Sequence, residues 1–341
     1  MSHAARLLVA ALRDPASVCA LSPDDWTALL TAARAERLIG TLAVRLDVRI
    51  LPPAVTRILA DAAEGAAQER RAALWEAEMA RRALAPLGVP VVLLKGTAFV
   101  AAGLDAGRCR AIGDLDILVP RAALPEVERA LIAAAWEWVK ADAYDDDYYR
   151  RWMHELPPLI HRERDRMIDV HHTILPPTAR PTPDAAALIA DAVPLGPEQG
   201  GGLAVLSPAD MIVHAAAHLF ADGDMAGGLR NLWDIDRLLR EYASDAFWQT
   251  LGARATLHEL TGSVRRAVRL AADLYATPVP TEWGGRVAGD APYRRRLFAR
   301  DGWGRQPFPF TRLGFYVRSH WLRMPPAMLA RHLWIKATKA K

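Results

Sequence analysis

A chain of 341 residues, 52% of them hydrophobic and 24% charged, has the composition of a folded globular protein with one compact core or two domains. Its two cysteines cannot form a disulfide framework, which favours a cytoplasmic location. No apolar run approaches the roughly 18 residues that span a bilayer, so the sequence predicts no transmembrane segment.

Residues 1–84 are predicted to form an N-terminal helical region. Its clearest signal is a helix start at Ser22, which can cap the helix while Asp25 reaches back to it in a capping box. Apolar residues follow at helical spacing, interrupted by Arg37. A longer helix is expected from about 53 to 87, because the glycine at the next position is a common helix end.

Residues 85–195 are predicted to form a core in which strand and helix signals alternate. The expected strands are residues 89–94, 114–119, 156–162 and 167–174. The expected helices are residues 97–104 and 122–135. This order is typical of a small mixed β-sheet, and with helical regions on either side it predicts an α+β fold.

The rest of the chain is predicted to be a linker followed by helices. Residues 176–202, rich in proline and glycine, form the expected linker. A C-terminal helical region is expected over 203–341, beginning at a second start signal around Ser207. Its last part, 291–341, holds twelve Lys or Arg against the single acid Asp301. This basic stretch predicts contact with an anionic partner, although a solvated helical tail is the simpler interpretation.

Two acids within the expected strand 114–119 are the main candidates for chemistry. On a strand, residues two positions apart point to the same face, so Asp114 and Asp116 project together. Neighbouring carboxylates repel each other unless a cation lies between them. Mg²⁺, or Mn²⁺ in its place, binds through such carboxylates together with substrate phosphates. A solvated acid pair at a strand edge would give the same motif, so the surrounding residues decide.

The residues upstream of this pair are suited to phosphate. Lys95, Gly96 and Thr97 mark a strand that ends at a helix start, where backbone N–H groups can approach a triphosphate and Lys95 can add a charge. Arg110 lies close to the acid pair and could reach phosphate oxygens or pair with a carboxylate. A plain strand-to-helix turn with a solvated lysine remains the alternative.

A third acid is available at Asp169, on the second strand of the expected hairpin, with His171 on the same face. Such an acid can deprotonate an attacking hydroxyl or complete a metal shell. A surface acid on a strand is the alternative for Asp169, and hydrogen-bonded packing is the alternative for His171. Further on, His214 and His218 share a helix face, but no Glu follows the first of them, which excludes a metalloprotease motif.

Four stretches of the chain resemble one known family. They are LLKGTAFVAAGLDAGRCRAIGDLDILV at 93–119, IDVHHTIL at 168–175, LSPADMIVHAAAHLF at 206–220 and LRNLWDIDRLL at 229–239. Together they are similar to the bacterial uncharacterised nucleotidyltransferase family of the DNA polymerase beta-like superfamily, over roughly residues 80–240. The resemblance implies that Gly96 is the family's glycine turn, Asp114 and Asp116 its metal ligands, and Asp169 its third acid.

The resemblance also matches the helical part of the family at His218 and Asp234. These two side chains are expected to form a polar pair that fixes the helices against the active site. Asp234 could also accept from Arg230, four residues earlier. Thr97 stands where the superfamily usually has serine.

Residues and resemblance together predict a Mg²⁺-dependent nucleotidyltransferase that moves a nucleotidyl group from a nucleoside triphosphate to an acceptor hydroxyl. The acceptor stays open between a small molecule, a peptide or protein, and an RNA. The expected catalytic residues are Asp114, Asp116 and Asp169; the expected nucleotide-binding residues are Lys95, Gly96, Thr97 and Arg110; the expected supporting residues are His171, His218 and Asp234. The alternative is a catalytically silent module of the same fold that binds a nucleotide or a protein partner.

Overall fold

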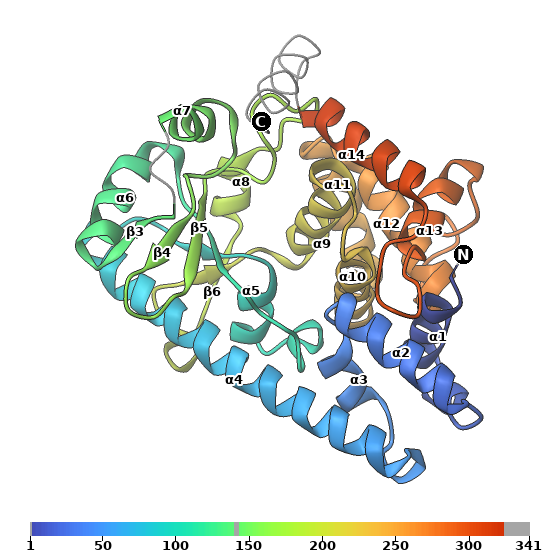
Figure 1. The fold of residues 1–341 in the computed structure, drawn as a ribbon. Helices are drawn as coiled ribbons and strands as arrows, with labels where there is room; N and C mark the ends of the chain where they lie inside the picture. Colours follow the sequence, from blue (N-terminus) through green and yellow to red (C-terminus); the bar gives the residue numbers. More distant parts are fainter. Residues whose placement is uncertain (1, 140–142, 324–341) are drawn as a thin grey trace.

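The computed structural model describes residues 2–139 and 143–323. Within these residues, one half of the molecule is a mixed sheet of seven strands with its covering helices, and the other half is built from helices of both chain ends (Figure 1). The long helix α4 runs along the edge of the molecule and connects the two halves (Figure 1). This architecture confirms the predicted α+β class.

The N-terminal helices agree with the start and stop signals of the sequence. They are α1 (His3–Arg13), α2 (Pro23–Ala35), α3 (Ile39–Arg45) and α4 (Pro53–Leu84). The capping box of α2 is present, because the backbone N–H of Asp25 donates to Oγ of Ser22 at 3.2 Å and that of Ser22 donates back to the Asp25 carboxylate at 3.4 Å. A short 3₁₀ turn follows α4 and ends at Gly88, whose φ of 62° lies in the left-handed region.

The strands form one sheet in the order β3-β4-β5-β2-β1-β7-β6. They are β1 (Val92–Leu93), β2 (Leu115–Leu118), β3 (Trp136–Trp138), β4 (Leu159–His161), β5 (Met167–His171), β6 (Val193–Pro194) and β7 (Ala204–Val205). Strands β2 and β5 are parallel neighbours at the centre, and β1 lies antiparallel on the other side of β2. All four strands expected from the sequence are therefore present, each shorter than its apolar run.

The prediction of a linker over 176–202 is wrong in part. This stretch contains the helix α8 (Ala185–Ala190) and the edge strand β6. The helix is held by Leu188, which is fully buried, and begins where Asp184 accepts from the backbone N–H of Ala187 at 2.9 Å. The sheet also continues to β7, after residue 195, where the sequence placed the end of the core.

Helices cover the sheet and fill the C-terminal region. Those near the sheet are α5 (Lys95–Ala101), α6 (Leu124–Ala133) and α7 (Ala143–Trp152). Those of the C-terminal region are α9 (Pro208–Ala217), α10 (Gly228–Tyr242), α11 (Asp245–Leu257), α12 (Thr261–Tyr275), α13 (Ala291–Leu297) and α14 (Pro309–Arg323). The start predicted at Ser207 is confirmed, since its Oγ accepts from the backbone N–H of Asp210 at 3.3 Å. In the described ranges, no helix is both long and apolar enough to cross a membrane.

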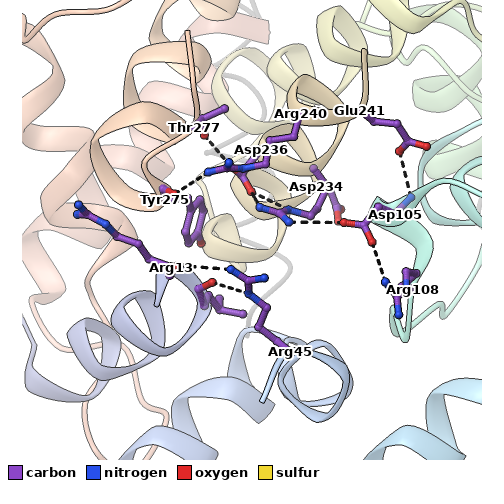
Figure 2. Close-up of polar contacts among 12 residues, drawn as sticks. Arg13, Arg45, Asp105, Arg108, Asp234, Asp236, Arg240, Glu241, Tyr275 and Thr277 are labelled. Atoms are coloured by element: carbon purple, nitrogen blue, oxygen red, sulfur yellow. Dashed lines mark hydrogen bonds and ion pairs between the residues drawn. The ribbon is translucent and has the colours of Figure 1, made fainter. Parts of the chain in front are cut away.

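An ionic network ties the loop before β2 to the C-terminal helices. Asp105 in this loop lies 3.5 Å from the guanidinium of Arg237 on α10, and its backbone N–H donates to Glu241 at 3.1 Å. Figure 2 shows the neighbouring part of the network, where Asp236 accepts from Thr277 at 2.6 Å and from Arg240 at 2.8 Å. These contacts hold the loop against α10.

Several arginines of the basic C-terminal stretch are used within the fold. Arg294 pairs with Asp273 at 3.0 Å, and Arg300 pairs with the buried carboxylate of Glu36 at 2.5 Å. These cations hold α13 and the segment after it against the helices, so they are not free for an anionic partner. The remainder of the stretch, 324–341, lies outside the described residues.

Candidate active site

A cavity of about 400 Å³ lies where the sheet meets the helical half. Its wall contains most of the residues selected from the sequence: Lys95, Gly96, Arg110, Asp114, Asp116, His218 and Asp234. Thr97, Asp169 and His171 are outside this wall. Asp169 and His171 nevertheless lie on β5, directly beside the strand that carries Asp116.

Asp116 is the centre of the charged cluster. It is 2% exposed, and its Oδ1 accepts from Nζ of Lys95 at 2.6 Å and contacts Nε2 of His171 at 3.0 Å. Burial alone would raise the pKa of Asp116, but the charge of Lys95 and the hydrogen bond from His171 outweigh it and hold that pKa well below its usual range. Asp116 is therefore ionised at neutral pH.

Backbone geometry brings Lys95 to this carboxylate. Leu94 at the end of β1 donates its N–H to the backbone carbonyl of Asp116 at 2.9 Å, and Lys95 then turns with a φ of 49° into α5. Burial would lower the pKa of Lys95, but Asp116, Asp114 and Glu155 together raise it above its ordinary value. Lys95 is thus a permanent cation facing the acids.

Asp114 is exposed and lies in the cavity wall just before β2. The loop that carries it is fixed from α4, because the Glu69 carboxylate accepts from the backbone N–H of Ile112 at 2.9 Å. Asp114 also contributes to raising the pKa of both Lys95 and Asp169, which places its charge near theirs. Asp114 and Asp116 thus face the same space from different depths.

Asp169 lies directly opposite Asp116 in the parallel pairing of β5 with β2. Its Oδ1 is buried and has no hydrogen-bond partner among the described residues. Burial, followed by the charges of Asp116 and Glu155, raises the pKa of Asp169 to about 7. Carboxylates that repel one another around an unsatisfied oxygen fit a divalent cation such as Mg²⁺, which binds oxygen ligands and offsets this repulsion.

Gly96 is in contact with the side chain of Arg110. A Cβ atom at position 96 would come within 2.1 Å of Nη1 of Arg110, so any side chain here would displace this guanidinium from its position. Nε of Arg110 donates to Asp234 at 3.1 Å, and Asp234 also accepts from Arg230 at 2.5 Å. The expected Arg230–Asp234 bond is confirmed, whereas a pairing of His218 with Asp234 stays a prediction.

Thr97 does not face the cavity. It is 1% exposed, and its Oγ1 has no hydrogen-bond partner among the described residues. The first turn of α5 therefore presents Lys95 and Gly96 to the cavity, and Thr97 lies behind them.

Three functional candidates were missed by the sequence reasoning. His214 lines the cavity; burial and the charge of Lys95 lower its pKa well below the ordinary value, so its ring is neutral. Arg37 follows α2 with a φ of 55° and also lines the cavity. Glu155 lies 3.4 Å from His171. Of the three, only Arg37 was visible in the sequence, where its charge interrupts a run of apolar residues at helical spacing.

Comparison with known proteins identifies the family of the chain. No curated protein sequence matches the chain. The model of one family, described as uncharacterised nucleotidyltransferase, matches residues 22–276. The match includes Arg37 after α2, the loop and strand with Asp114 and Asp116, β5 with Asp169, and α10 with Asp234. The chain belongs to this nucleotidyltransferase family.

Proposed function

We propose that the cavity is the active site of a Mg²⁺-dependent nucleotidyltransferase of the DNA polymerase beta-like superfamily, which transfers a nucleotidyl group from a nucleoside triphosphate to an acceptor hydroxyl. One observation carries the proposal: Asp169 on β5 is paired with Asp116 on β2. Asp114 precedes Asp116 by two residues, so the three acids are close to one another. Asp114 and Asp116 would hold Mg²⁺ or Mn²⁺. Such an ion would supply positive charge that offsets the negative charge developing on the phosphate during transfer.

Cations in the cavity wall supply the binding site for the triphosphate. Lys95 and Arg110 come from the sheet side and Arg37 from the helical side. A Cβ atom on Gly113 would lie 3.7 Å from Nη1 of Arg37, so this guanidinium lies beside the loop that carries Asp114. Arg37 has no acidic partner in the described part of the chain, which leaves its charge for a phosphate.

The transfer itself needs one proton acceptor. The oxygen of the acceptor hydroxyl attacks the α-phosphorus while the carboxylate of Asp169 takes the hydroxyl proton. The bond between the α-phosphorus and the oxygen that bridges to the β-phosphate breaks, and pyrophosphate leaves with that electron pair. His171 holds Asp116 in place through its Nε2 contact at 3.0 Å. The acceptor is a small molecule, a peptide or protein, or an RNA.

Incubation with labelled nucleotides tests this proposal. The purified protein is incubated with each radiolabelled nucleoside triphosphate, Mg²⁺ and a lysate of the source cell, and products are separated by size and by sensitivity to nuclease and protease. We expect one nucleotide to label one class of acceptor, and Asp114→Asn to abolish the labelling. Equal labelling by wild type and Asp114→Asn would exclude the proposed site.

One observation favours a second function, the catalytically silent binding module. Nζ of Lys95 already neutralises Asp116 at 2.6 Å, so this carboxylate has a counter-charge without a metal ion. A silent module predicts nucleotide binding that does not depend on Mg²⁺. Calorimetric titration of a nucleoside triphosphate with and without Mg²⁺ separates the two functions, because the enzyme requires the ion for tight binding.

A further inference from the structure

A second group of metal-ligating side chains lies behind the acids of the cavity. His154, Glu155 and His171 each offer one ligand atom, and these atoms all lie within 4.8 Å of one another. Oε2 of Glu155 is 3.4 Å from Nδ1 of His171 and 3.9 Å from Nε2 of His154. The two histidines are 7% and 2% exposed, so the group is shielded from solvent.

Backbone pairing holds this group together. Glu155 forms an isolated antiparallel bridge with His171, so their side chains extend from directly opposed positions. The N–H of His172 donates to the carbonyl of His154 at 2.9 Å, and the N–H of Leu156 donates to the carbonyl of Val170 at 2.9 Å. The segment that carries His154 and Glu155 therefore runs along the end of β5 in a fixed register.

His171 has the hydrogen-bonding pattern of a metal ligand. Its Nε2 lies 3.0 Å from Oδ1 of Asp116, which also accepts from Nζ of Lys95 at 2.6 Å, so Nε2 is the donor in this contact. Its Nδ1 is buried, faces Glu155 and has no hydrogen-bond partner among the described residues. In a neutral ring, the lone pair of Nδ1 would face the Glu155 carboxylate, and a metal ion bound between the two would remove this repulsion. Histidines that bind metals characteristically donate their other ring N–H to a carboxylate.

We propose that His154, Glu155 and His171 form a binding site for a transition-metal ion of the Zn²⁺ type, separate from the Mg²⁺ site of Asp114 and Asp116. Two imidazole nitrogens with one carboxylate oxygen suit Zn²⁺ better than Mg²⁺, which prefers oxygen ligands. Zn–ligand bonds of about 2.1 Å in a tetrahedron put ligand atoms roughly 3.4 Å apart. The separations of 3.4 and 3.9 Å around Glu155 require only small side-chain movements to match.

The ion would act on the reaction through Asp116. An ion on Nδ1 fixes the tautomer and the ring orientation of His171, and so keeps Nε2–H directed at Oδ1 of Asp116. His171 is then a positioning residue for the carboxylate that would hold Mg²⁺. This consequence rests on the proposed function, whereas the binding of Zn²⁺ does not.

Zn²⁺ titration of the full-length protein tests the site. Protein treated with a chelator and dialysed is titrated with Zn²⁺ alone, and the bound metal is measured by elemental analysis after gel filtration. We expect one Zn²⁺ per chain in wild type. We expect Glu155→Gln and His154→Ala to weaken binding by more than the roughly 10- to 100-fold that loss of an outer hydrogen-bond partner costs.

Two control variants distinguish this site from its neighbours. His172→Asn removes an adjacent histidine whose Nε2 lies 3.2 Å from the carbonyl of Met153, so it should keep the Zn²⁺ affinity. Asp114→Asn removes a ligand of the proposed Mg²⁺ site, so it should lose nucleotidyl transfer and still bind Zn²⁺. Wild type that binds Zn²⁺ but transfers no nucleotide would contradict the proposed function alone, and wild type that transfers a nucleotide but binds no Zn²⁺ would contradict the metal site alone.

A Co²⁺ spectrum of wild type makes the test independent of variants that fail to fold. Co²⁺ held by two histidines and a carboxylate in a tetrahedral site absorbs strongly in the visible range. An equal amount of Zn²⁺ should displace the Co²⁺ and so abolish this absorption. Absence of that absorption, or equal Zn²⁺ binding by wild type and a folded Glu155→Gln variant, would overturn the proposal. In that case His171 would be protonated on both ring nitrogens and would bridge the carboxylates of Asp116 and Glu155 without a metal ion.

Discussion

Asp114 and Asp116, which the sequence presents as one motif, differ in their surroundings. Asp114 is exposed at the cavity, whereas Asp116 is 2% exposed and bonded to Lys95 and His171. The alternation of side chains along a strand predicts that the two carboxylates share a face of the sheet. It does not predict how deeply each carboxylate is buried. The distinction decides how the two residues respond to substitution.

We predict that Asp116→Asn destabilises the protein and Asp114→Asn does not. The pKa of Asp116 is held below its usual range, so the fold stabilises the charged form, and removing it leaves Lys95 buried beside an uncharged amide. The free energy of unfolding should fall by about 3 kcal/mol for Asp116→Asn and by less than about 0.5 kcal/mol for Asp114→Asn. Urea denaturation at pH 7 measures both, and equal values for the two variants would contradict this account of the site.

Arg37 is the residue whose role depends most on the tertiary structure. We predict that Arg37→Ala weakens nucleotide binding about 10-fold or more, because it removes a charged hydrogen bond to phosphate worth roughly 1.5–3 kcal/mol. Arg34→Ala is the control, since Arg34 is exposed on α2, three residues before Arg37, and is outside the cavity wall. Calorimetric titration with Mg²⁺ and nucleotide compares them; an unchanged affinity in Arg37→Ala would remove Arg37 from the site.

At the scale of elements, the sequence predicts the helices and strands that have a regular apolar pattern or a capping residue at one end. The capping box at Ser22, the length of α4 and the strands β2 and β5 were all accessible from local patterns. The short strands β6 and β7 contain no periodicity to detect; β7 is placed by its pairing with β1, and β6 by its pairing with β7. The parallel pairing of β2 with β5, which brings Asp169 beside Asp116, is a long-range contact that local patterns do not encode.

The start of α9 illustrates how a local signal gains a tertiary role. Asp210 accepts from Arg254 at 2.8 and 2.7 Å, through Nε and Nη2, and from Ser207 at 2.8 Å. Burial would raise the pKa of Asp210, but hydrogen bonds from His258, Arg254 and Ser207 outweigh it and lower the pKa. The charged form of Asp210 therefore stabilises α9, the helix that carries His214 into the cavity.

We predict that Asp210→Asn lowers the free energy of unfolding by about 3 kcal/mol at pH 7. Because the pKa of Asp210 is lowered by folding, its contribution is present above the ordinary value of about 3.9 and is lost as pH falls through the folded-state pKa. The difference between wild type and variant should therefore shrink below about pH 4. Asp245→Asn, at an exposed first-turn position of α11, is the control and should change stability by less than about 0.5 kcal/mol. A difference independent of pH would show that Asp210 does not act by its charge.

At the scale of the whole molecule, the cavity exists because two halves meet. The sheet supplies Lys95 and the acids, while the helices supply Arg37, His214 and Asp234. The ion pair of Arg110 with Asp234 crosses this junction, as does that of Asp105 with Arg237. The sequence placed these residues in separate regions, and only the family resemblance suggested that the helical part serves the site.

The central claim is that Asp114 acts through its charge on a metal–nucleotide complex, and thermal unfolding tests it without knowledge of the acceptor. Asp114 is the better position for this test because its replacement by Asn is expected to change the stability of the apo protein by less than about 0.5 kcal/mol. Melting temperatures of wild type and Asp114→Asn are measured alone, with Mg²⁺, with each nucleoside triphosphate, and with both together. A ligand at 100 times its dissociation constant stabilises the folded state by about 2.7 kcal/mol. The account predicts that Mg²⁺ and one nucleotide together raise the melting temperature of wild type, and that this increase is lost in Asp114→Asn. No increase in wild type, or the same increase in both proteins, would contradict it.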